Sequence, residues 1–242
     1  MNKINRATHA IIVAAGKGNR LKPITLTTPK PLIKVNGKMM IETIIESLHE
    51  NGIKKIYVVV GYLKEKFKIL VEKYPHIKLI ENPFYEVANN ISSLYVARHL
   101  ISNSMILDGD QIINDKSVLD PNYNRSGYNC IWTDVKTNEW VLDVEGGKVV
   151  KCNRDGALKG WQLFSVSRWT KEDGVKLKSH LEYEFEINKN YSLFWDDLPL
   201  IKYLNQYNLE VYEMGANDVI EIDTYDELVE IDKSYVQLSE KE

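Results

Sequence analysis

A glycine-containing loop that directly follows an apolar run is the feature that most constrains the fold. Residues 9–13 form a short apolar run that is typical of a buried strand, and the loop at residues 14–21 opens directly after it. A strand that opens into glycines brings backbone N–H groups close to phosphate oxygens. The sequence therefore predicts a nucleotide-binding turn at this strand end, and we assign to it Ala14, Ala15, Gly16 and Gly18.

Two cationic side chains flank the loop, and we predict that both are catalytic. The Arg20 guanidinium can donate two hydrogen bonds to the oxygens of a polyphosphate. Lys30 lies between two prolines and therefore carries a compact positive charge on a stiff segment. A dinucleotide-binding G-x-G-x-x-G turn is excluded because its third glycine position holds Leu21, and a P-loop is excluded by spacing and by its missing hydroxyl. The remaining alternative is a basic surface loop.

Alternating strand and helix patterns predict the fold class. The chain of 242 residues suits one large α/β domain or a domain with a substantial insertion. We expect a mostly parallel mixed sheet with helices on both faces. The predicted strands are residues 9–13, 56–60, 77–80 and 104–107, and the predicted helices are residues 40–48, 63–74 and 91–101. Ligands of such sheets collect at the carboxyl ends of the strands.

Acidic residues at two strand ends suggest a metal site. Asp108 and Asp110 follow the strand at 104–107, at the same sheet edge as the glycine loop. Carboxylate oxygens suit Mg²⁺, so Asp110 is the better ligand candidate, and Asp108 orients the turn or a water at the nucleotide site. A solvated turn is the alternative. Glu221 and Asp223 alternate with isoleucines, so we expect both on one face of a late strand.

Aromatic and acidic residues cluster in the later half of the chain, where we expect the acceptor to bind. A quaternary ammonium cannot donate hydrogen bonds, and aromatic faces and carboxylates hold it instead. The candidates for such a box are Trp140, Trp195, Asp196 and Asp197. The alternative is that the tryptophans pack in the core.

The loop region resembles the signature of the sugar-nucleotide and nucleotidyltransferase superfamily over residues 13–32. The resemblance implies a Rossmann-like nucleotidyltransferase fold and an enzyme that joins a nucleoside triphosphate to a phosphorylated acceptor. It implies that Asp223 completes a Mg²⁺ site with Asp110. It also implies that Asn90 and Ser92 meet the nucleobase, with helix capping as the alternative. We expect Glu221 to contact the acceptor. The alternatives are that it supports the metal ligands without binding the metal, or that it lies on a polar outer face of the strand.

Four further segments resemble the bacterial CTP:phosphocholine cytidylyltransferases of the LicC type, and the likeness spans about residues 9–232. These segments are residues 89–95, 137–140, 195–197 and 221–223. The resemblance implies that CTP and phosphocholine give CDP-choline and pyrophosphate with Mg²⁺. Two alternatives stay open: a different acceptor, such as an aminoalkylphosphonate or a sugar 1-phosphate, and a catalytically silent nucleotide-binding subunit.

Domain organisation and partners follow from the same patterns. We expect a single domain, residues 1–242, with a nucleotide-binding core (9–129), an acceptor-binding part (130–200) and a return to the core with a C-terminal helix (201–242). A net charge of −3 gives no general attraction to nucleic acid or to anionic membranes. Without a signal peptide or membrane span, and with two cysteines, we expect a cytoplasmic protein with reduced thiols, as a monomer or homodimer.

Overall fold

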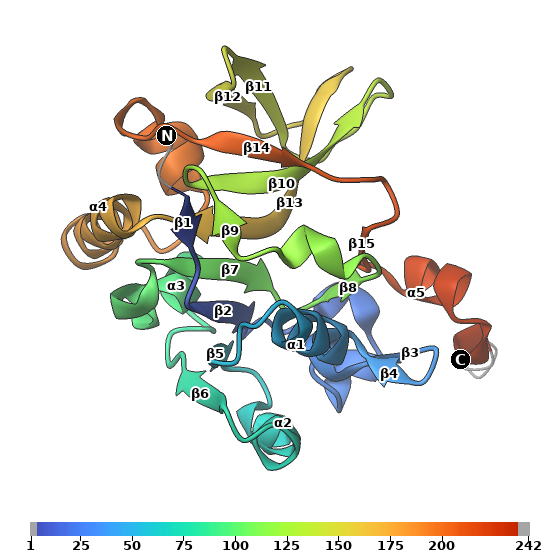
Figure 1. Ribbon diagram of the computed structural model, residues 1–242. Helices are drawn as coiled ribbons and strands as arrows, with labels where there is room; N and C mark the ends of the chain where they lie inside the picture. The colour runs from blue at the N-terminus through green and yellow to red at the C-terminus, as the bar shows by residue number, and fades with distance from the viewer. Residues whose placement is uncertain (1–3, 237–242) are drawn as a thin grey trace.

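A nine-stranded mixed sheet organises the protein, whose computed structural model describes residues 4–236 (Figure 1). The ends of the predicted 1–242 domain, residues 1–3 and 237–242, lie outside the described residues. The strands run in the order β12-β11-β13-β7-β2-β5-β6, and β10 pairs with both β13 and β14. The first half of the sheet is parallel and consists of β2 (His9–Ala14), β5 (Ile56–Val60), β6 (Ile77–Glu81) and β7 (Ser104–Asp108).

The second half of the sheet is mostly antiparallel and joins the first half without a break. Strand β13 pairs antiparallel with β7, and β14 pairs parallel with β10. The later strands are β10 (Gly127–Thr133), β11 (Val141–Glu145), β12 (Lys148–Asn153), β13 (Gly160–Trp169) and β14 (Glu210–Glu213). Strands β10 to β14 therefore extend the same sheet, as Figure 1 shows.

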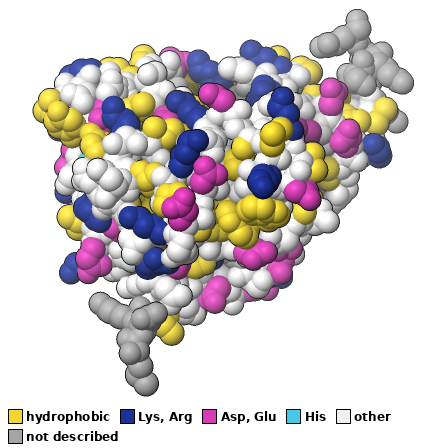
Figure 2. Space-filling view, turned by 90° about the horizontal axis from the view of Figure 1, so that it is seen from above, with side chains coloured by type: hydrophobic (Ala, Val, Ile, Leu, Met, Phe, Trp, Pro, Cys, Tyr) yellow, Lys and Arg dark blue, Asp and Glu magenta, His cyan; other side chains and the backbone are white. Residues whose placement is uncertain are grey.

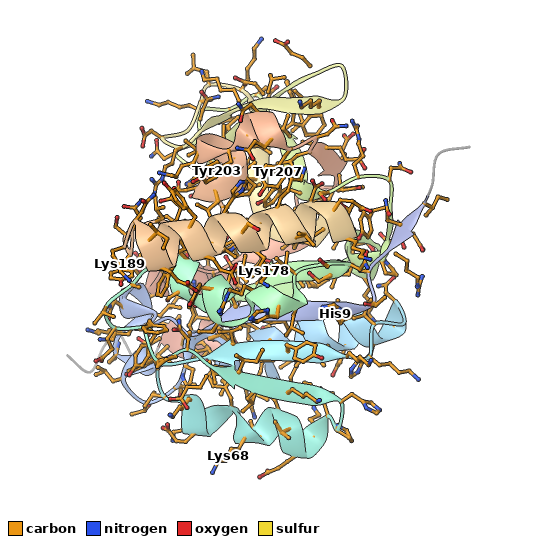
Figure 3. All side chains as sticks on the ribbon, turned by 90° about the vertical axis from the view of Figure 1, so that its left-hand side faces the viewer. His9, Lys68, Lys178, Lys189, Tyr203 and Tyr207 are labelled. Atoms are coloured by element: carbon orange, nitrogen blue, oxygen red, sulfur yellow. The ribbon has the colours of Figure 1, made fainter. Side chains whose placement is uncertain are left out.

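Helices cover both faces of this sheet because β2 alternates its side chains between two cores. Ala10 and Ile12 lie in one core together with Ile44 of α1. Ile11 lies in the other core, with Leu94 of α3 and side chains of α4. The helices are α1 (Met40–Glu50), α2 (Lys68–Lys73), α3 (Ile91–Val96), α4 (Lys171–Glu182) and α5 (Tyr225–Ile231). Figure 3 shows α4, which carries the labelled Lys178, lying across its face of the sheet.

Three two-stranded pairs complete the fold. They are β1 (Asn5–Arg6) with β9 (Asn122–Tyr123), β3 (Lys34–Val35) with β4 (Lys38–Met39), and β8 (Gln111–Ile113) with β15 (Val219–Glu221). Short 3₁₀ turns lie at η1 (Asn19–Leu21), η2 (Ile24–Leu26), η3 (Lys30–Leu32), η4 (Lys64–Phe67), η5 (Arg98–Leu100), η6 (Lys116–Leu119), η9 (Leu204–Gln206) and η10 (Lys233–Tyr235). Two π turns are η7 (Tyr183–Ile187) and η8 (Leu198–Lys202).

The predicted α/β fold is confirmed, and three element boundaries differ from the sequence-based expectation. The helix expected at 63–74 is divided into η4 and α2, and the helix expected at 91–101 is interrupted at Ala97 between α3 and η5. The late strand β15 ends at Glu221, so Asp223 does not share a strand face with it. Thr224 and Glu227 form a capping box that begins α5, and this ends the extended segment.

The surface of the described residues carries charged and hydrophobic side chains together. No helix within residues 4–236 is both long and apolar enough to cross a membrane. On the face shown in Figure 2, basic and acidic side chains are interspersed with hydrophobic ones.

Candidate active site

A cavity of about 450 Å³ opens where the carboxyl ends of the parallel strands meet. The loop after β2, the turn after β7 and the segment after β15 all contribute to its wall. Twelve of the predicted site residues line it: Ala14, Ala15, Gly16, Gly18, Arg20, Lys30, Asn90, Ser92, Asp108, Asp110, Glu221 and Asp223. Residues that are more than 200 positions apart in the sequence thus share one cavity.

The glycine loop bends closely around the segment that carries Lys30. Gly18 has a φ of 61°, a left-handed conformation that favours glycine. A Cβ at this position would lie 3.0 Å from the Lys30 Cβ and 3.1 Å from the Thr25 Cγ2. The Thr25 hydroxyl donates a hydrogen bond of 2.9 Å to the Gly18 carbonyl. Gly18 therefore allows the loop and the Lys30 segment to pack together.

A second close approach brings the acidic turn against the same loop. The Gly109 N–H donates to the Val13 carbonyl over 2.9 Å. A Cβ at Gly109 would lie 3.1 Å from the Ala14 Cβ and 3.2 Å from the Pro31 Cγ. A larger residue at Gly109 would push these segments apart, so the glycine holds the flanking Asp108 and Asp110 close to the loop.

Strand pairing brings the late acids to Asp110. In the β15–β8 pair, Glu221 lies opposite Gln111, the residue after Asp110. As a result, one carboxylate oxygen from each of Asp110, Glu221 and Asp223 lies within 4.8 Å of the others. The expectation that Glu221 and Asp223 share a strand face is wrong, because Asp223 lies beyond the strand. The two side chains nevertheless converge on Asp110.

Two cations already contact this acidic cluster. The Lys30 ammonium lies 2.6 Å from Asp110 Oδ2 and 2.8 Å from Asp223 Oδ1. Arg20 Nη2 lies 2.7 Å from the same Asp223 oxygen. Lys30 is only 7% exposed, and burial lowers its pKa, but attraction to Asp110 and hydrogen bonds to both carboxylates outweigh burial and raise the pKa overall. Lys30 therefore stays charged at neutral pH.

The pKa values of Glu221 and Asp108 show how much negative charge is concentrated in this part of the cavity. Burial raises the pKa of Glu221, and repulsion from Asp110 and Asp223 raises it further. Burial likewise raises the pKa of Asp108, and the neighbouring Asp110 and Asp196 add to the effect. Carboxyl groups in this position are ionised most readily when a cation lies among them.

The donor set fits a hard divalent cation. Mg²⁺ prefers carboxylate oxygens, and three carboxylates converge here. Asp110 Oδ1 is buried and has no hydrogen-bond partner within residues 4–236, so one ligand atom is left for a metal. Glu221, which we expected to contact the acceptor, lies among these potential ligands.

Asn90 and Ser92 also line the cavity, at the start of α3. The Asn90 side chain makes no capping hydrogen bond within the described chain. Instead, its Oδ1 accepts a hydrogen bond from the backbone N–H of Trp195 over 2.9 Å. Ser92 Oγ donates to the Asn89 carbonyl over 2.8 Å and accepts from Asn82 Nδ2 over 2.9 Å. Capping therefore does not account for Asn90.

Sequence reasoning missed several cavity residues, of which Asn82, Tyr85 and Phe194 matter most. Asn82 directly follows β6, so the rule that ligands collect at strand ends would have found it. Phe194 directly precedes Trp195 in the sequence. Phe194 lines the cavity, whereas Trp195, which the sequence had suggested, does not.

None of the four predicted box residues, Trp140, Trp195, Asp196 and Asp197, lines the cavity, and Trp195 and Asp196 are buried away from it. Trp195 is 1% exposed, stacks on Tyr128 with ring centroids 6.1 Å apart, and packs edge-on against Trp169. The expectation that its ring faces an acceptor does not fit this packing, because Trp195 belongs to the core. Asp196 is 6% exposed, and burial raises its pKa to about 7.

The other two predicted residues form an aromatic–carboxylate corner beside the cavity. The rings of Trp140 and Phe194 lie 5.9 Å apart at 78°. Asp197 accepts the Phe194 N–H over 2.8 Å and lies 3.3 Å from Arg154 Nη1. The Arg154 guanidinium carbon lies 5.2 Å from the Trp140 ring centroid and 5.1 Å from that of Phe194. Because Phe194 also lines the cavity, the corner borders it, and a cation of the chain itself fills the corner.

Comparisons with known proteins agree with this geometry. A family model described as nucleotidyl transferase matches residues 9–124. The 2-aminoethylphosphonate cytidylyltransferase of Lancefieldella rimae is 37% identical over 234 residues, which are 96% of this chain and 94% of that relative. The choline-phosphate cytidylyltransferase of Streptococcus pneumoniae is 36% identical over 234 residues, 93% of this chain and 98% of that relative.

A solved structure is similar over almost the whole fold. The CTP:phosphocholine cytidylyltransferase of Streptococcus pneumoniae (LicC) superposes with a TM-score of 0.87 at 34% identity. The match covers 95% of this chain and 99% of that one. The sheet, the helices on both faces and the later strands are thus common to the two folds.

Proposed function

We propose that this chain, which belongs to the nucleotidyl transferase family and within it to the cytidylyltransferases, transfers CMP from CTP to phosphocholine. The products are CDP-choline and pyrophosphate. The observation that carries the choice of acceptor is the corner of Trp140, Phe194 and Asp197, which borders the nucleotide cavity and holds a cation. Residues 130–200, which supply these side chains, are proposed as the acceptor-binding part of a single domain.

The nucleotide is proposed to bind along the glycine loop. Backbone N–H groups around Gly16 and Gly18 lie at the end of a strand, where they can donate to phosphate oxygens. Asn90 and Ser92 are proposed to lie beside the cytosine, where the Asn90 amide can donate a hydrogen bond to the base. Asn82 and Ser92 are hydrogen-bonded to each other over 2.9 Å and position this helix start.

Asp110 and Asp223 are proposed to hold Mg²⁺, with Glu221 beside them. The bound ion would neutralise phosphate charge and polarise the phosphate oxygens. The unpartnered Asp110 Oδ1 and the convergence of three carboxylates support this assignment.

The reaction is proposed to be an in-line displacement at the α-phosphorus of CTP. An oxygen of the acceptor phosphate forms the new P–O bond, the bond between the α-phosphorus and the bridging oxygen breaks, and its electron pair leaves with pyrophosphate. The attacking phosphate is already ionised near neutral pH, so the chain supplies neither a nucleophile nor a base. Its contribution is positioning and charge neutralisation.

Lys30 and Arg20 would supply that charge. Lys30 is buried, charged and fixed between Asp110 and Asp223, so its ammonium is directed into the phosphate-binding part of the cavity. The Arg20 side chain is 68% exposed and contacts one Asp223 oxygen, so it can turn from that carboxylate to the departing pyrophosphate at little cost.

The corner fits phosphocholine because a trimethylammonium group depends on aromatic faces and a nearby carboxylate. The guanidinium of Arg154 lies within about 6 Å of both ring centroids, the range of a cation–π contact. Its presence supports cation binding at this position.

A second acceptor, 2-aminoethylphosphonate, is favoured by one specific finding, the relative that is 37% identical over 96% of this chain. A primary ammonium could donate hydrogen bonds to a carboxylate such as Asp197 and would depend less on the rings. A catalytically silent subunit is disfavoured, because a binding protein has no need for Arg20 and Lys30 beside a cluster of three acids.

Pyrophosphate release distinguishes these possibilities. Each of the four ribonucleoside triphosphates is assayed with Mg²⁺ against phosphocholine, 2-aminoethylphosphonate and glucose 1-phosphate. We expect the highest kcat/KM for CTP with phosphocholine. A higher kcat/KM for CTP with the phosphonate would reject phosphocholine as the acceptor, and no release with any pair would reject transferase activity.

Replacing Trp140 tests the aromatic corner. We expect Trp140→Ala to raise the KM for phosphocholine about tenfold, since a partly desolvated cation–π contact is worth roughly 1–2 kcal/mol. The KM for CTP should stay within about twofold of the parent. Trp132→Ala is the matched control, because Trp132 is 53% exposed and its ring packs against Trp161, whereas Trp140 packs against Phe194 and Arg154. An unchanged KM for phosphocholine in Trp140→Ala would count against the corner.

The cellular setting is part of the same proposal. We place the protein in the cytoplasm, as a monomer or homodimer with small-molecule substrates and without nucleic-acid or membrane partners. Cys130 and Cys152 are free thiols, which supports a reducing compartment.

A further inference from the structure

We propose that Arg154 determines acceptor specificity by competing with the substrate's cationic group for the corner of Trp140, Phe194 and Asp197. The inference rests on the proposed function, because it assumes that the acceptor's cation binds in this corner. It adds a residue that does not line the nucleotide cavity and that no sequence pattern singled out.

Strand register places Arg154 at the corner. Val141 lies opposite Asn153 in the antiparallel β11–β12 pair. The next positions outward are Trp140 and Arg154, which are therefore cross-strand neighbours at the end of the hairpin. The sheet itself thus holds the guanidinium next to the indole, whereas Phe194 and Asp197 approach from the segment before η8.

The contacts of Arg154 are those that a trimethylammonium group would need. Its guanidinium carbon lies 5.2 Å from the Trp140 centroid and 5.1 Å from the Phe194 centroid, and its Nη1 lies 3.3 Å from Asp197 Oδ1. Two cations cannot share the same two faces and the same carboxylate, because they would repel each other at close range. An acceptor cation that enters the corner must therefore displace Arg154.

Displacement is feasible because Arg154 is only partly enclosed. Its side chain is 42% exposed, so water competes for the guanidinium, whereas the Asp197 side chain is 3% exposed and needs a cation beside it, which an incoming acceptor cation supplies. A displaced Arg154 can extend into solvent, since it follows the end of β12. Arg154 is thus a competitor for the corner and not a permanent block.

Competition changes selectivity because acceptor cations differ in what they need from the corner. A quaternary ammonium has no N–H donors and depends on the aromatic faces that Arg154 covers. A primary ammonium keeps three donors and can bind carboxylates without those faces. Arg154 therefore reduces the advantage of phosphocholine over an aminoalkyl acceptor.

The test is Arg154→Ala, assayed with saturating CTP and Mg²⁺ against phosphocholine and 2-aminoethylphosphonate. We expect the KM for phosphocholine to fall by about three- to tenfold, within the range of one cation–π contact, with kcat and the KM for CTP unchanged. The ratio of kcat/KM for phosphocholine to that for the phosphonate should rise. Arg154→Lys, which keeps the charge but not the planar stacking, should lie between the parent and Arg154→Ala.

Arg98→Ala is the matched control. The Arg98 guanidinium also lies over an aromatic ring, 4.1 Å from the Tyr95 centroid, and pairs with Glu182 over 3.0 Å, but neither partner belongs to the corner of Trp140, Phe194 and Asp197. It should leave both acceptor KM values unchanged. A fall in KM for phosphocholine in Arg98→Ala would show that loss of any such arginine suffices and would overturn the proposal.

Calorimetric titration of phosphocholine into the parent and into Arg154→Ala separates this proposal from the proposed function. Tighter binding in Arg154→Ala supports the competition, whichever acceptor is turned over. An unchanged or weaker affinity overturns it, because Arg154 would then be neutral or would itself hold the acceptor phosphate. If the parent turns over only 2-aminoethylphosphonate, the proposed acceptor fails, and the affinities still decide the role of Arg154.

Discussion

Asp110→Asn is expected to lower kcat by about a thousandfold or more. The change removes one negative charge and one metal-binding oxygen from the cluster with Glu221 and Asp223 while keeping the side chain's size. Loss of metal-supported charge stabilisation is worth several kcal/mol in the transition state, and each 1.36 kcal/mol is tenfold in rate. The measurement is pyrophosphate release from CTP and phosphocholine over a range of Mg²⁺ concentrations.

Two comparisons make the Asp110 result specific. Asp134→Asn removes an exposed acid from the turn after β10 and should leave kcat and the Mg²⁺ dependence unchanged. In Asp110→Asn, residual activity should require a higher Mg²⁺ concentration for half-maximal rate. Activity within a few-fold of the parent, with the same Mg²⁺ dependence, would show that Asp110 is not a ligand.

Lys30→Ala is expected to lower kcat by about a hundredfold or more, the scale on which enzymes lose a single electrostatic stabiliser. Lys30 is buried and charged, and its ammonium is the cation that lies between Asp110 and Asp223. Without Lys30, a buried positive charge would no longer stabilise the negative charge that builds up as the bond to pyrophosphate breaks. Steady-state kinetics with CTP and phosphocholine measure the effect.

Lys30→Met distinguishes charge from packing, because methionine fills most of the buried volume without the ammonium. Both substitutions should lower kcat to a similar level if charge is what matters. Lys34→Ala removes an exposed lysine from β3 nearby and serves as the control, with kinetics like those of the parent. A Lys30→Met enzyme with near-parental kcat would contradict an electrostatic role for Lys30.

Much of the phosphate-binding side could be predicted from the sequence, because local patterns encode it. The apolar run before Ala14 and the glycines after it specify a strand and a tight turn, and the structure has both. Asp110 follows another buried run, and parallel strands place their carboxyl ends at one edge of the sheet. Short-range signals and one topological rule were enough to bring these residues to one cavity.

The acceptor side could not be predicted in the same way, because it depends on packing between distant segments. Trp195 and Trp140 have similar acidic neighbours in the sequence, but Trp195 packs on Tyr128 in the core and Phe194 takes the position beside the cavity. Arg154 meets Trp140 only through the register of the β11–β12 pair. Composition does not encode that register.

The interruption of the predicted helix at Ala97 and the end of β15 at Glu221 have a related cause. Apolar periodicity continues through both positions, but it does not report where the backbone changes conformation. At the second position, Thr224 and Glu227 begin α5 with a capping box, and this signal would have placed the boundary correctly. Asp223 is therefore held by a helix start and not by a strand.

A crystal structure of the protein with CDP-choline and Mg²⁺ tests the central claim most directly. We predict the cytosine beside Asn90 and Ser92, the diphosphate between the glycine loop and Lys30, and the trimethylammonium group between the Trp140 and Phe194 rings, with Arg154 displaced. Product density outside this cavity, with Arg154 still over Trp140, would contradict the account.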